Sequence, residues 1–182
     1  SNDNVVRKAY FNPETLQAAV GLTEIDGKLY YFSSNGWALS GKQSADGVTY
    51  YFSPSTYEAY TGWYRDTDGG DYYFDGKNGR LTGPGVFEIE DSYYYLGSGG
   101  KRLTGLKVIG NARMYFDEIT AQSVDGFVYM PDTKKVYYFD KNKDARYGLQ
   151  TIDGNEYMFS DVGVMKYGLQ TIDGIKYFFD ET

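Results

Sequence analysis

The sequence has no cysteine and no histidine, and it contains only four prolines and two tryptophans. Without cysteine, the fold can use neither a disulfide framework nor a zinc–thiolate site. Without histidine, the Ser-His-Asp and Cys-His catalytic arrangements are excluded. No apolar run reaches the ~18 residues that a membrane-spanning helix needs, so we expect no membrane insertion.

Positive charge is also scarce. The 18 Lys and Arg residues are outnumbered by 25 Asp and Glu residues, which gives a net charge of −7. Nucleic-acid binding needs clustered basic side chains to neutralise phosphates, and no such cluster occurs. An anionic membrane surface is disfavoured for the same reason. We therefore expect an uncharged partner, such as a polysaccharide or glycan, and no nucleic acid.

Aromatic residues and glycine are abundant instead. The chain has 21 Tyr, 11 Phe and 23 Gly among 182 residues, and its mean hydropathy is −0.54. Each large ring can remove roughly 150–250 Å² from water, so Tyr and Phe can hold a thin structure together. Because disordered chains are poor in aromatics, the composition predicts a folded protein.

An exact internal repeat organises the sequence. The segment GLQTIDG at Gly148–Gly154 recurs at Gly168–Gly174, 20 residues later. Such a fixed period is typical of repeat architectures. Aligned aromatic triplets, such as Tyr50-Tyr51-Phe52, predict nine repeats in one repeat domain over residues 1–182. Full repeats start near residues 21, 41, 62, 83, 105, 126, 148 and 168, with Gly85 as the alternative to Gly83.

Each repeat reads as a short strand, a turn, an aromatic strand and a second turn. The first turn is Asp-Gly at residues 26–27, 46–47, 68–69, 153–154 and 173–174. Asp-Gly between β-prone runs predicts a type I′ hairpin. A single hairpin is marginal in water, so each must bury its aromatic face against its neighbours. We therefore predict an all-β chain, a β-solenoid of about nine consecutive hairpins.

The aromatic triplets predict where the core lies. Side chains alternate along a strand, so the first and third triplet positions share one face. The third position is Phe in eight of nine repeats, with Tyr93-Tyr94-Tyr95 as the exception, and we assign it to the core. The middle Tyr is expected at the surface or in a groove. Residues 105–140 lose the Asp-Gly turn, which fits either a binding site or unselected drift.

At this point the residues match a known family. The pattern G-L-Q-T-I-D-G-x-x-Y-x-F, clearest over Gly148–Phe179, resembles the cell-wall-binding repeat superfamily of Gram-positive bacteria. That superfamily includes choline-binding repeats, glucan-binding repeats and the oligopeptide repeats of clostridial toxins. The resemblance implies a left-handed β-solenoid with shallow grooves between hairpins. It also implies a secreted or cell-surface protein whose repeats anchor an attached enzyme or toxin to a cell wall, glucan or host glycan.

The residues favour one branch of this superfamily. The resemblance implies that choline-binding repeats carry one Trp directly after the first Gly and another directly before the Tyr pair, because aromatic faces attract a cation. In this chain the position before the Tyr pair is never Trp, and the Trp after the first Gly occurs only at Trp63. The pattern is more similar to the glucan-binding and toxin-type branch, although the long repeats of the toxins are missing. By that similarity the sugar-contacting residues are Gln43, Gln150, Gln170, Tyr51, Tyr157 and Tyr177.

These residues predict a carbohydrate-binding module. Sugars stack on aromatic rings while amides and carboxylates bond their hydroxyls. Trp63 is a candidate stacking platform, whereas Trp37 is expected to be packing. We expect no catalytic residues, metal or cofactor, because the Asp residues fall mostly in turns. The alternatives are that the Tyr residues are only core and the chain is a spacer or adhesive stalk, or that it is the receptor-binding region of a toxin.

The chain is also expected to be part of a longer polypeptide. Its first repeat lacks a start and its last lacks an end, and Ser1–Asn4 show none of the charged and apolar regions of a signal peptide.

Overall fold

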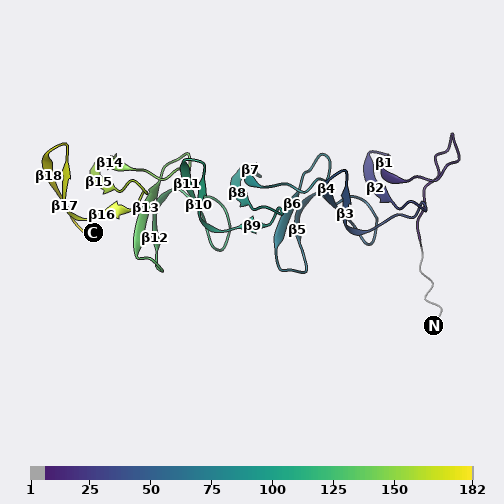
Figure 1. Cartoon of the computed structure of the whole chain (residues 1–182), viewed down its shortest axis with the longest axis horizontal. Coiled ribbons are helices and arrows are strands. Elements are labelled where there is room, and N and C mark those ends of the chain that lie inside the picture. Colours follow the sequence, from purple (N-terminus) through teal and green to yellow (C-terminus); the bar gives the residue numbers. More distant parts are fainter. Residues whose placement is uncertain (1–6, 182) are drawn as a thin grey trace. The chain divides into compact units, whose positions relative to one another are not determined.

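The computed structural model describes residues 7–181, and these contain strands β1 to β18 and no helix (Figure 1). The prediction that Ser1–Asn4 is not part of a signal peptide concerns residues outside the described range. The strands are β1 (Gly21–Ile25), β2 (Lys28–Phe32), β3 (Gly41–Ala45), β4 (Val48–Phe52), β5 (Gly62–Arg65), β6 (Asp71–Phe74), β7 (Gly85–Ile89), β8 (Ser92–Leu96), β9 (Arg102–Leu103), β10 (Gly105–Ile109), β11 (Ala112–Phe116), β12 (Gly126–Met130), β13 (Lys135–Phe139), β14 (Gly148–Ile152), β15 (Asn155–Phe159), β16 (Met165–Lys166), β17 (Gly168–Ile172) and β18 (Ile175–Phe179).

Consecutive strands form antiparallel hairpins, which confirms the all-β prediction. The first strand of a hairpin opens at a glycine that lies opposite the final Phe of the second strand, as in Gly41↔Phe52 and Gly148↔Phe159. The short strand β16 adds a third strand to the β14–β15 sheet. Residues 105–140, which lack the Asp-Gly turn, still form the regular hairpins β10–β11 and β12–β13.

The hairpin turns follow the sequence at most positions. Both residues of Asp26-Gly27 and of Asp153-Gly154 have positive φ, as a type I′ turn requires. The prediction is wrong at Asp68-Gly69. There the chain makes a longer loop, closed by a bond from the Asp66 N–H to the Gly70 carbonyl at 2.9 Å. Only Gly69 of the pair has positive φ, and the Asp68 carboxylate supports this loop by accepting from the Gly70 N–H at 2.7 Å.

The core lies where the aromatic triplets predicted it. The third-position residues Phe52, Phe74, Phe116, Phe139 and Phe159 are all 0% exposed. The prediction is wrong at the first triplet, where Phe11 is 60% exposed, and Phe179 of the last triplet is only partly buried. At the fifth triplet the prediction was wrong by one residue. Strand β8 ends at Leu96, which is 0% exposed and takes the core position, whereas Tyr93 is 38% exposed. Glu90 and Asp91 both have positive φ and form this turn without glycine, which the Asp-Gly search could not detect.

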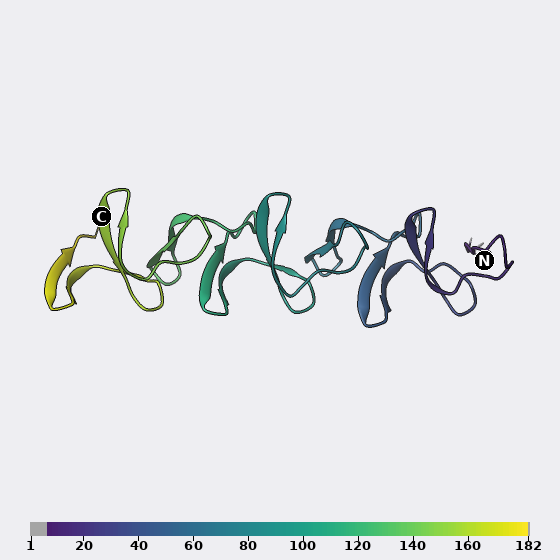
Figure 2. The same ribbon diagram turned by 90° about the horizontal axis from the view of Figure 1, so that it is seen from above.

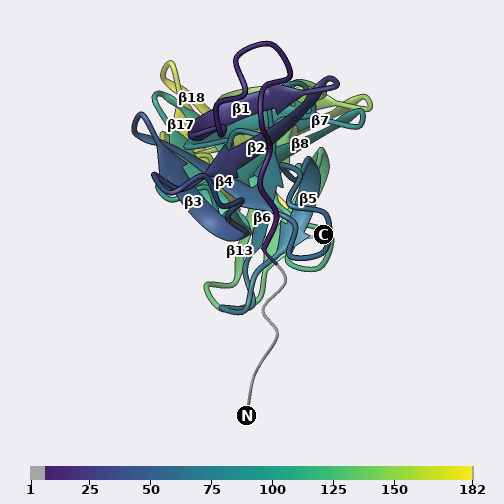
Figure 3. The same cartoon turned by 90° about the vertical axis from the view of Figure 1, so that its right-hand side faces the viewer.

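The chain divides into two compact units, Ser1–Pro84 with Leu96–Arg102 and Gly85–Tyr95 with Leu103–Thr182. Within each unit, the segment after one hairpin bonds to the hairpin before it. In the first, the Ala59 N–H donates to the Leu29 carbonyl at 2.7 Å and the Tyr60 N–H to the Tyr51 carbonyl at 2.7 Å. Figure 2 shows the hairpins as separate arms of the ribbon that are joined by these connecting segments. Figure 3 shows hairpins β1–β2, β3–β4 and β5–β6 of the first unit pointing in different directions.

Candidate functional site: a tyrosine cluster and the grooves between hairpins

Three tyrosines gather where hairpin β3–β4 meets hairpin β5–β6. The rings of Tyr51 and Tyr64 lie 4.0 Å apart between centroids with an interplanar angle of 31°. Tyr60, from the connecting segment, stands edge-on to Tyr64 at 5.5 Å. Phe74 lies against all three, 6.2 to 6.5 Å away. We call Tyr51, Tyr60 and Tyr64 the tyrosine cluster.

Hydrogen bonds fix the hydroxyls of the tyrosine cluster. The side-chain hydrogen bond with Tyr51, followed by burial, raises the pKa of Tyr64 to about 12. The Tyr60 hydroxyl donates to the Trp63 carbonyl at 3.0 Å. Tyr60 remains 37% exposed. The cluster therefore offers a ring at the surface whose orientation is set by packing and by a hydrogen bond, which suits stacking on a sugar.

Trp63 lies on the other face of β5, since neighbouring residues of a strand point to opposite sides. Its ring is 5.2 Å from that of Tyr73, in an edge-on arrangement. The guanidinium of Arg102 lies over the Trp63 ring at 5.1 Å. Arg102 also bonds the Asp71 carboxylate at 2.6 Å. A cation of the protein itself therefore occupies this face of Trp63. Trp37 is 39% exposed and also carries a cation, because the Arg7 guanidinium lies 5.7 Å from its ring centroid.

The three predicted glutamines share one local role. Each side-chain amide donates to the backbone carbonyl three residues earlier, from Gln43 to Ser40 at 2.8 Å, from Gln150 to Tyr147 at 2.6 Å and from Gln170 to Tyr167 at 2.9 Å. Because these carbonyls immediately precede the opening strands, the glutamine holds the entry of the hairpin. In each case one donor bond of the side-chain amide is already made within the protein.

The predicted glutamine–tyrosine pairs come together in two repeats of three. Gln150 lies directly opposite Tyr157, and Gln170 directly opposite Tyr177, each on one face of its hairpin. Gln43 lies opposite Tyr50 instead, so Tyr51 points to the other face. Sequence spacing placed Gln43 and Tyr51 in one repeat, but only strand register determines which face each takes.

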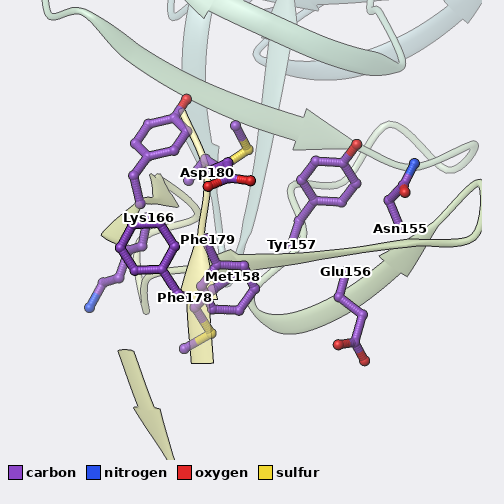
Figure 4. A pocket seen from close by; sticks show the side chains of 10 residues that line it. Asn155, Glu156, Tyr157, Met158, Lys166, Phe178, Phe179 and Asp180 are labelled. Carbon is purple, nitrogen blue, oxygen red and sulfur yellow. The ribbon is translucent and has the colours of Figure 1, made fainter. Parts of the chain in front are cut away.

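A groove of about 310 Å³ lies between the last two hairpins. Its walls come from Asn155–Met158 of β15, from Met165–Tyr167 and from Phe178–Asp180. Figure 4 shows Tyr157 and Asn155 on one side and Lys166 and Phe178 on the other. Tyr157 also contacts Phe127 at 5.0 Å between ring centroids.

Sequence reasoning missed Tyr60 and Tyr64. Tyr60 is two residues before Gly62, and Tyr64 follows Trp63, so both flank the recognised Gly-Trp start. The sequence signal that could have indicated this cluster is the unusual density of aromatic residues around Gly62. Their approach to Tyr51 depends on contacts between hairpins, which spacing along one repeat does not encode.

Over residues 7–181, no group of three or more acidic side chains is placed to hold a metal ion. In the same range, no helix has the length and apolarity needed to cross a membrane.

Comparison with known proteins identifies the class. Residues 21–36 match a family described as a putative cell wall binding repeat. A glucosyltransferase-S of Streptococcus mutans serotype c is 28% identical over 167 residues, 90% of this chain and 11% of that protein. CbpJ of Streptococcus pneumoniae has a similar fold, with a TM-score of 0.75 at 22% identity over 91% of this chain and 65% of its own.

A second pneumococcal structure is similar in sequence as well. Choline-binding protein F has a TM-score of 0.69 at 26% identity, covering 87% of this chain and 54% of its own. It has also been solved in the presence of a peptidoglycan analogue, where the TM-score is 0.67. The chain carries repeats of the cell-wall-binding repeat superfamily, as its sequence pattern predicted. It spans only a small part of the glucosyltransferase and about half of choline-binding protein F.

Proposed function

We propose that this chain is a non-catalytic carbohydrate-binding module that anchors an attached protein to a polysaccharide or glycan. It acts at or near a bacterial cell surface, as part of a longer secreted or wall-associated polypeptide. Its partner is a neutral or weakly charged sugar polymer, in keeping with the net charge of −7.

The observation that carries this proposal is the tyrosine cluster. Tyr60 presents a partly exposed ring that is held by the Trp63 carbonyl and by Tyr64. Because the ring is already fixed, a sugar that stacks on it immobilises little that was free. A single contact of this kind is weak, but several along one polymer gain strength through effective concentration.

The relatives support the same direction. The name of glucosyltransferase-S denotes an enzyme that transfers glucosyl groups, and the structure of choline-binding protein F has been solved in the presence of a peptidoglycan analogue. Choline is a poorer candidate at Trp63, because Arg102 already lies over that ring. The attraction between a cation and an aromatic face is satisfied there within the protein.

The solenoid is part of the proposal. In each compact unit, the segment after a hairpin bonds to the preceding hairpin, which supports a continuous stack of repeats. In the second unit the Ser123 N–H donates to the Tyr93 carbonyl at 2.8 Å and the Val124 N–H to the Tyr115 carbonyl at 3.1 Å. Such a stack presents similar grooves at regular intervals, which suits a polymer.

One observation favours a structural spacer instead. Gln150 and Gln170, expected to contact sugar, each donate a side-chain amide hydrogen bond to a backbone carbonyl of the protein. A spacer needs these bonds and no ligand. The spacer therefore remains the second candidate, and binding measurements separate the two.

The test is retention of the purified chain on a glycan array, on bacterial cell walls and on dextran. The binding module predicts selective retention that soluble sugar competes away. Tyr60→Ala should weaken it about twofold to twelvefold, since aromatic contacts contribute roughly 0.5–1.5 kcal/mol. Tyr129→Ala is the control, because Tyr129 is a 59% exposed tyrosine outside the tyrosine cluster. A folded chain that fails on all three surfaces would establish the spacer.

A further inference from the structure

A polar groove in the first compact unit contains none of the residues of the tyrosine cluster. It has a volume of about 340 Å³. Three parts of the chain form it: hairpin β1–β2 at residues 24–29, the connecting segment at residues 58–61, and the turn after β6 at residues 76–79. Among residues 7–181, no aromatic ring lines this groove. Stacking of the kind that Tyr60 offers is therefore not available there.

Backbone contacts hold the walls of the groove in place. The Ala59 N–H donates to the Leu29 carbonyl at 2.7 Å, which ties the connecting segment to the hairpin. Gly79 packs against this segment so closely that an added Cβ would lie 3.0 Å from the Cβ of Ala59. The Asp75 carboxylate braces the turn by accepting from the Lys77 N–H at 2.9 Å. Because the walls are already ordered, a ligand would have little backbone to immobilise.

Two side chains of opposite charge lie in separate walls, and both are exposed. Glu24 lies directly opposite Leu29 in hairpin β1–β2, so the two side chains share the face that lines the groove. Lys77 belongs to the turn after β6. Within residues 7–181, neither the Glu24 nor the Lys77 side chain makes a hydrogen bond or an ion pair. A carboxylate only accepts and an ammonium only donates, so the groove offers a ligand both kinds of partner.

Two further side chains of the lining are only partly used by the protein. Glu58 accepts from Lys28 at 2.8 Å and from the Tyr30 hydroxyl at 3.3 Å, and both bonds go to Oε1. Asn78 uses its side-chain oxygen within its own turn. In the part of the chain that the structure describes, Oε2 of Glu58 and the side-chain N–H groups of Asn78 therefore remain available to a ligand.

The same backbone framework recurs one repeat later without these groups. The Leu81 N–H donates to the Thr49 carbonyl at 2.8 Å, which makes Thr49 the counterpart of Leu29. The hollow there measures about 220 Å³ and is lined by residues 47–49, 81–83 and 99–100. None of these residues is charged, and the counterpart of Glu24 is Ser44. The fold thus builds such a groove without charged side chains, and those of the first groove are not needed for folding.

We propose that this polar groove is a second carbohydrate subsite, which holds a sugar unit by hydrogen bonds to its hydroxyl groups without stacking on a ring. The inference rests on the proposed carbohydrate-binding function and adds a contact for the same polymer. The lining carries two carboxylates, Glu24 and Glu58, and two ammonium groups, Lys28 and Lys77, so its charges balance. Because a hydroxyl both donates and accepts, a neutral sugar can pair with all of them. A polymer that also reaches the tyrosine cluster would gain from both contacts.

The experiment measures the slowing of the purified chain in gels that contain dextran, a neutral glucan, and its retention on bacterial cell walls. Glu24→Ala and Lys77→Ala should each weaken binding about threefold to tenfold, as expected for a lost hydrogen bond. Neither substitution removes a side-chain bond within residues 7–181, so denaturant unfolding should be unchanged. High salt should leave the binding of a neutral sugar intact, because it screens only interactions between charges.

The second compact unit supplies matched controls. Glu88 holds in β7 the position that Glu24 holds in β1. Lys141 lies in the turn after β13, directly before an asparagine, as Lys77 does in the turn after β6. Both control residues are exposed and lie outside the groove. Glu88→Ala and Lys141→Ala change the net charge in the same way as the groove variants, and we expect them to bind like the unaltered chain.

Each unfavourable outcome has its own meaning. If the unaltered chain binds and both groove variants bind equally well, the subsite is wrong while the carbohydrate-binding function stands. If the folded, unaltered chain binds neither dextran nor cell walls, the function and the subsite fail together. Equal weakening in the control variants would assign the effect to net charge. Binding that is lost in high salt would assign the groove to a charged ligand.

Discussion

The Asp71 carboxylate lies 2.6 Å from Nη2 of Arg102, and this ion pair holds the Arg102 guanidinium 5.1 Å from the ring of Trp63. The two charged residues are 31 positions apart and are only 19% and 25% exposed. The contact therefore links hairpin β5–β6 to the chain one repeat later. It also uses the aromatic face that a ligand cation would need.

Replacing Arg102 by Met should destabilise the protein. Arg102→Met keeps most of the aliphatic volume but removes the ion pair and the cation–π contact, a loss of about 1–2 kcal/mol in unfolding free energy. Denaturant unfolding measures it. Arg65→Met is the control: it removes a second contact to the same Asp71 at 3.2 Å, but from a side chain that is 70% exposed. An equal loss in both variants would show that Trp63 adds nothing.

Replacing Gln150 by Ala should lower stability without altering glycan retention. The variant leaves the Tyr147 carbonyl without its 2.6 Å bond, which costs about 0.5–1.5 kcal/mol. Thermal unfolding and cell-wall retention, measured on the same preparation, separate the two effects. If retention falls at unchanged stability, Gln150 contacts the sugar as its position in the repeat predicted.

The fold was predictable because the sequence of each repeat contains the signals for its own turn, its buried face and its period. Asp153-Gly154 gives the turn, the alternation from Tyr157 to Phe159 gives the buried face, and the 20-residue period gives the tandem arrangement. The site was less predictable. The approach of Tyr60 to Tyr51 and of Arg102 to Trp63 depends on packing between repeats that differ in sequence. A pattern averaged over repeats removes the differences that create such contacts.

Alkaline pH should release the loop that Asp68 supports. The Tyr72 hydroxyl donates to the Asp68 carboxylate at 2.7 Å, and this bond, followed by burial, raises the pKa of Tyr72 from 10.0 to about 12. A raised pKa means that the associated stability is complete below pH 10 and is lost as the pH rises towards 12. Ultraviolet absorbance of tyrosinate follows the ionisation, and circular dichroism follows unfolding.

Asp68→Asn provides the matched variant for this titration. Its amide oxygen can still accept from Tyr72, but it no longer disfavours a phenolate by its charge. We expect the Tyr72 pKa to move back towards its ordinary value, so that ionisation of Tyr72 no longer makes the stability fall between pH 10 and pH 12. The pKa of Tyr64, held near 12 mainly by Tyr51, should not change. An unchanged Tyr72 titration would assign its shift to burial alone.

Two phenylalanines at the same position of repeats that share the GLQTIDG segment should differ in their contribution to stability. Phe159 is 0% exposed beneath the paired segment Met165–Lys166, whereas no segment within residues 7–181 pairs with β18 in the same way and Phe179 is partly exposed. Phe159→Ala should cost about 3–5 kcal/mol of unfolding free energy, as for a buried aromatic side chain. Phe179→Ala should cost less than half as much, because much of its surface is already in contact with water. Denaturant unfolding of both variants measures the difference. Equal costs would mean that the ring of Phe179 contributes as much to stability as the fully buried ring of Phe159, whatever its contact with water.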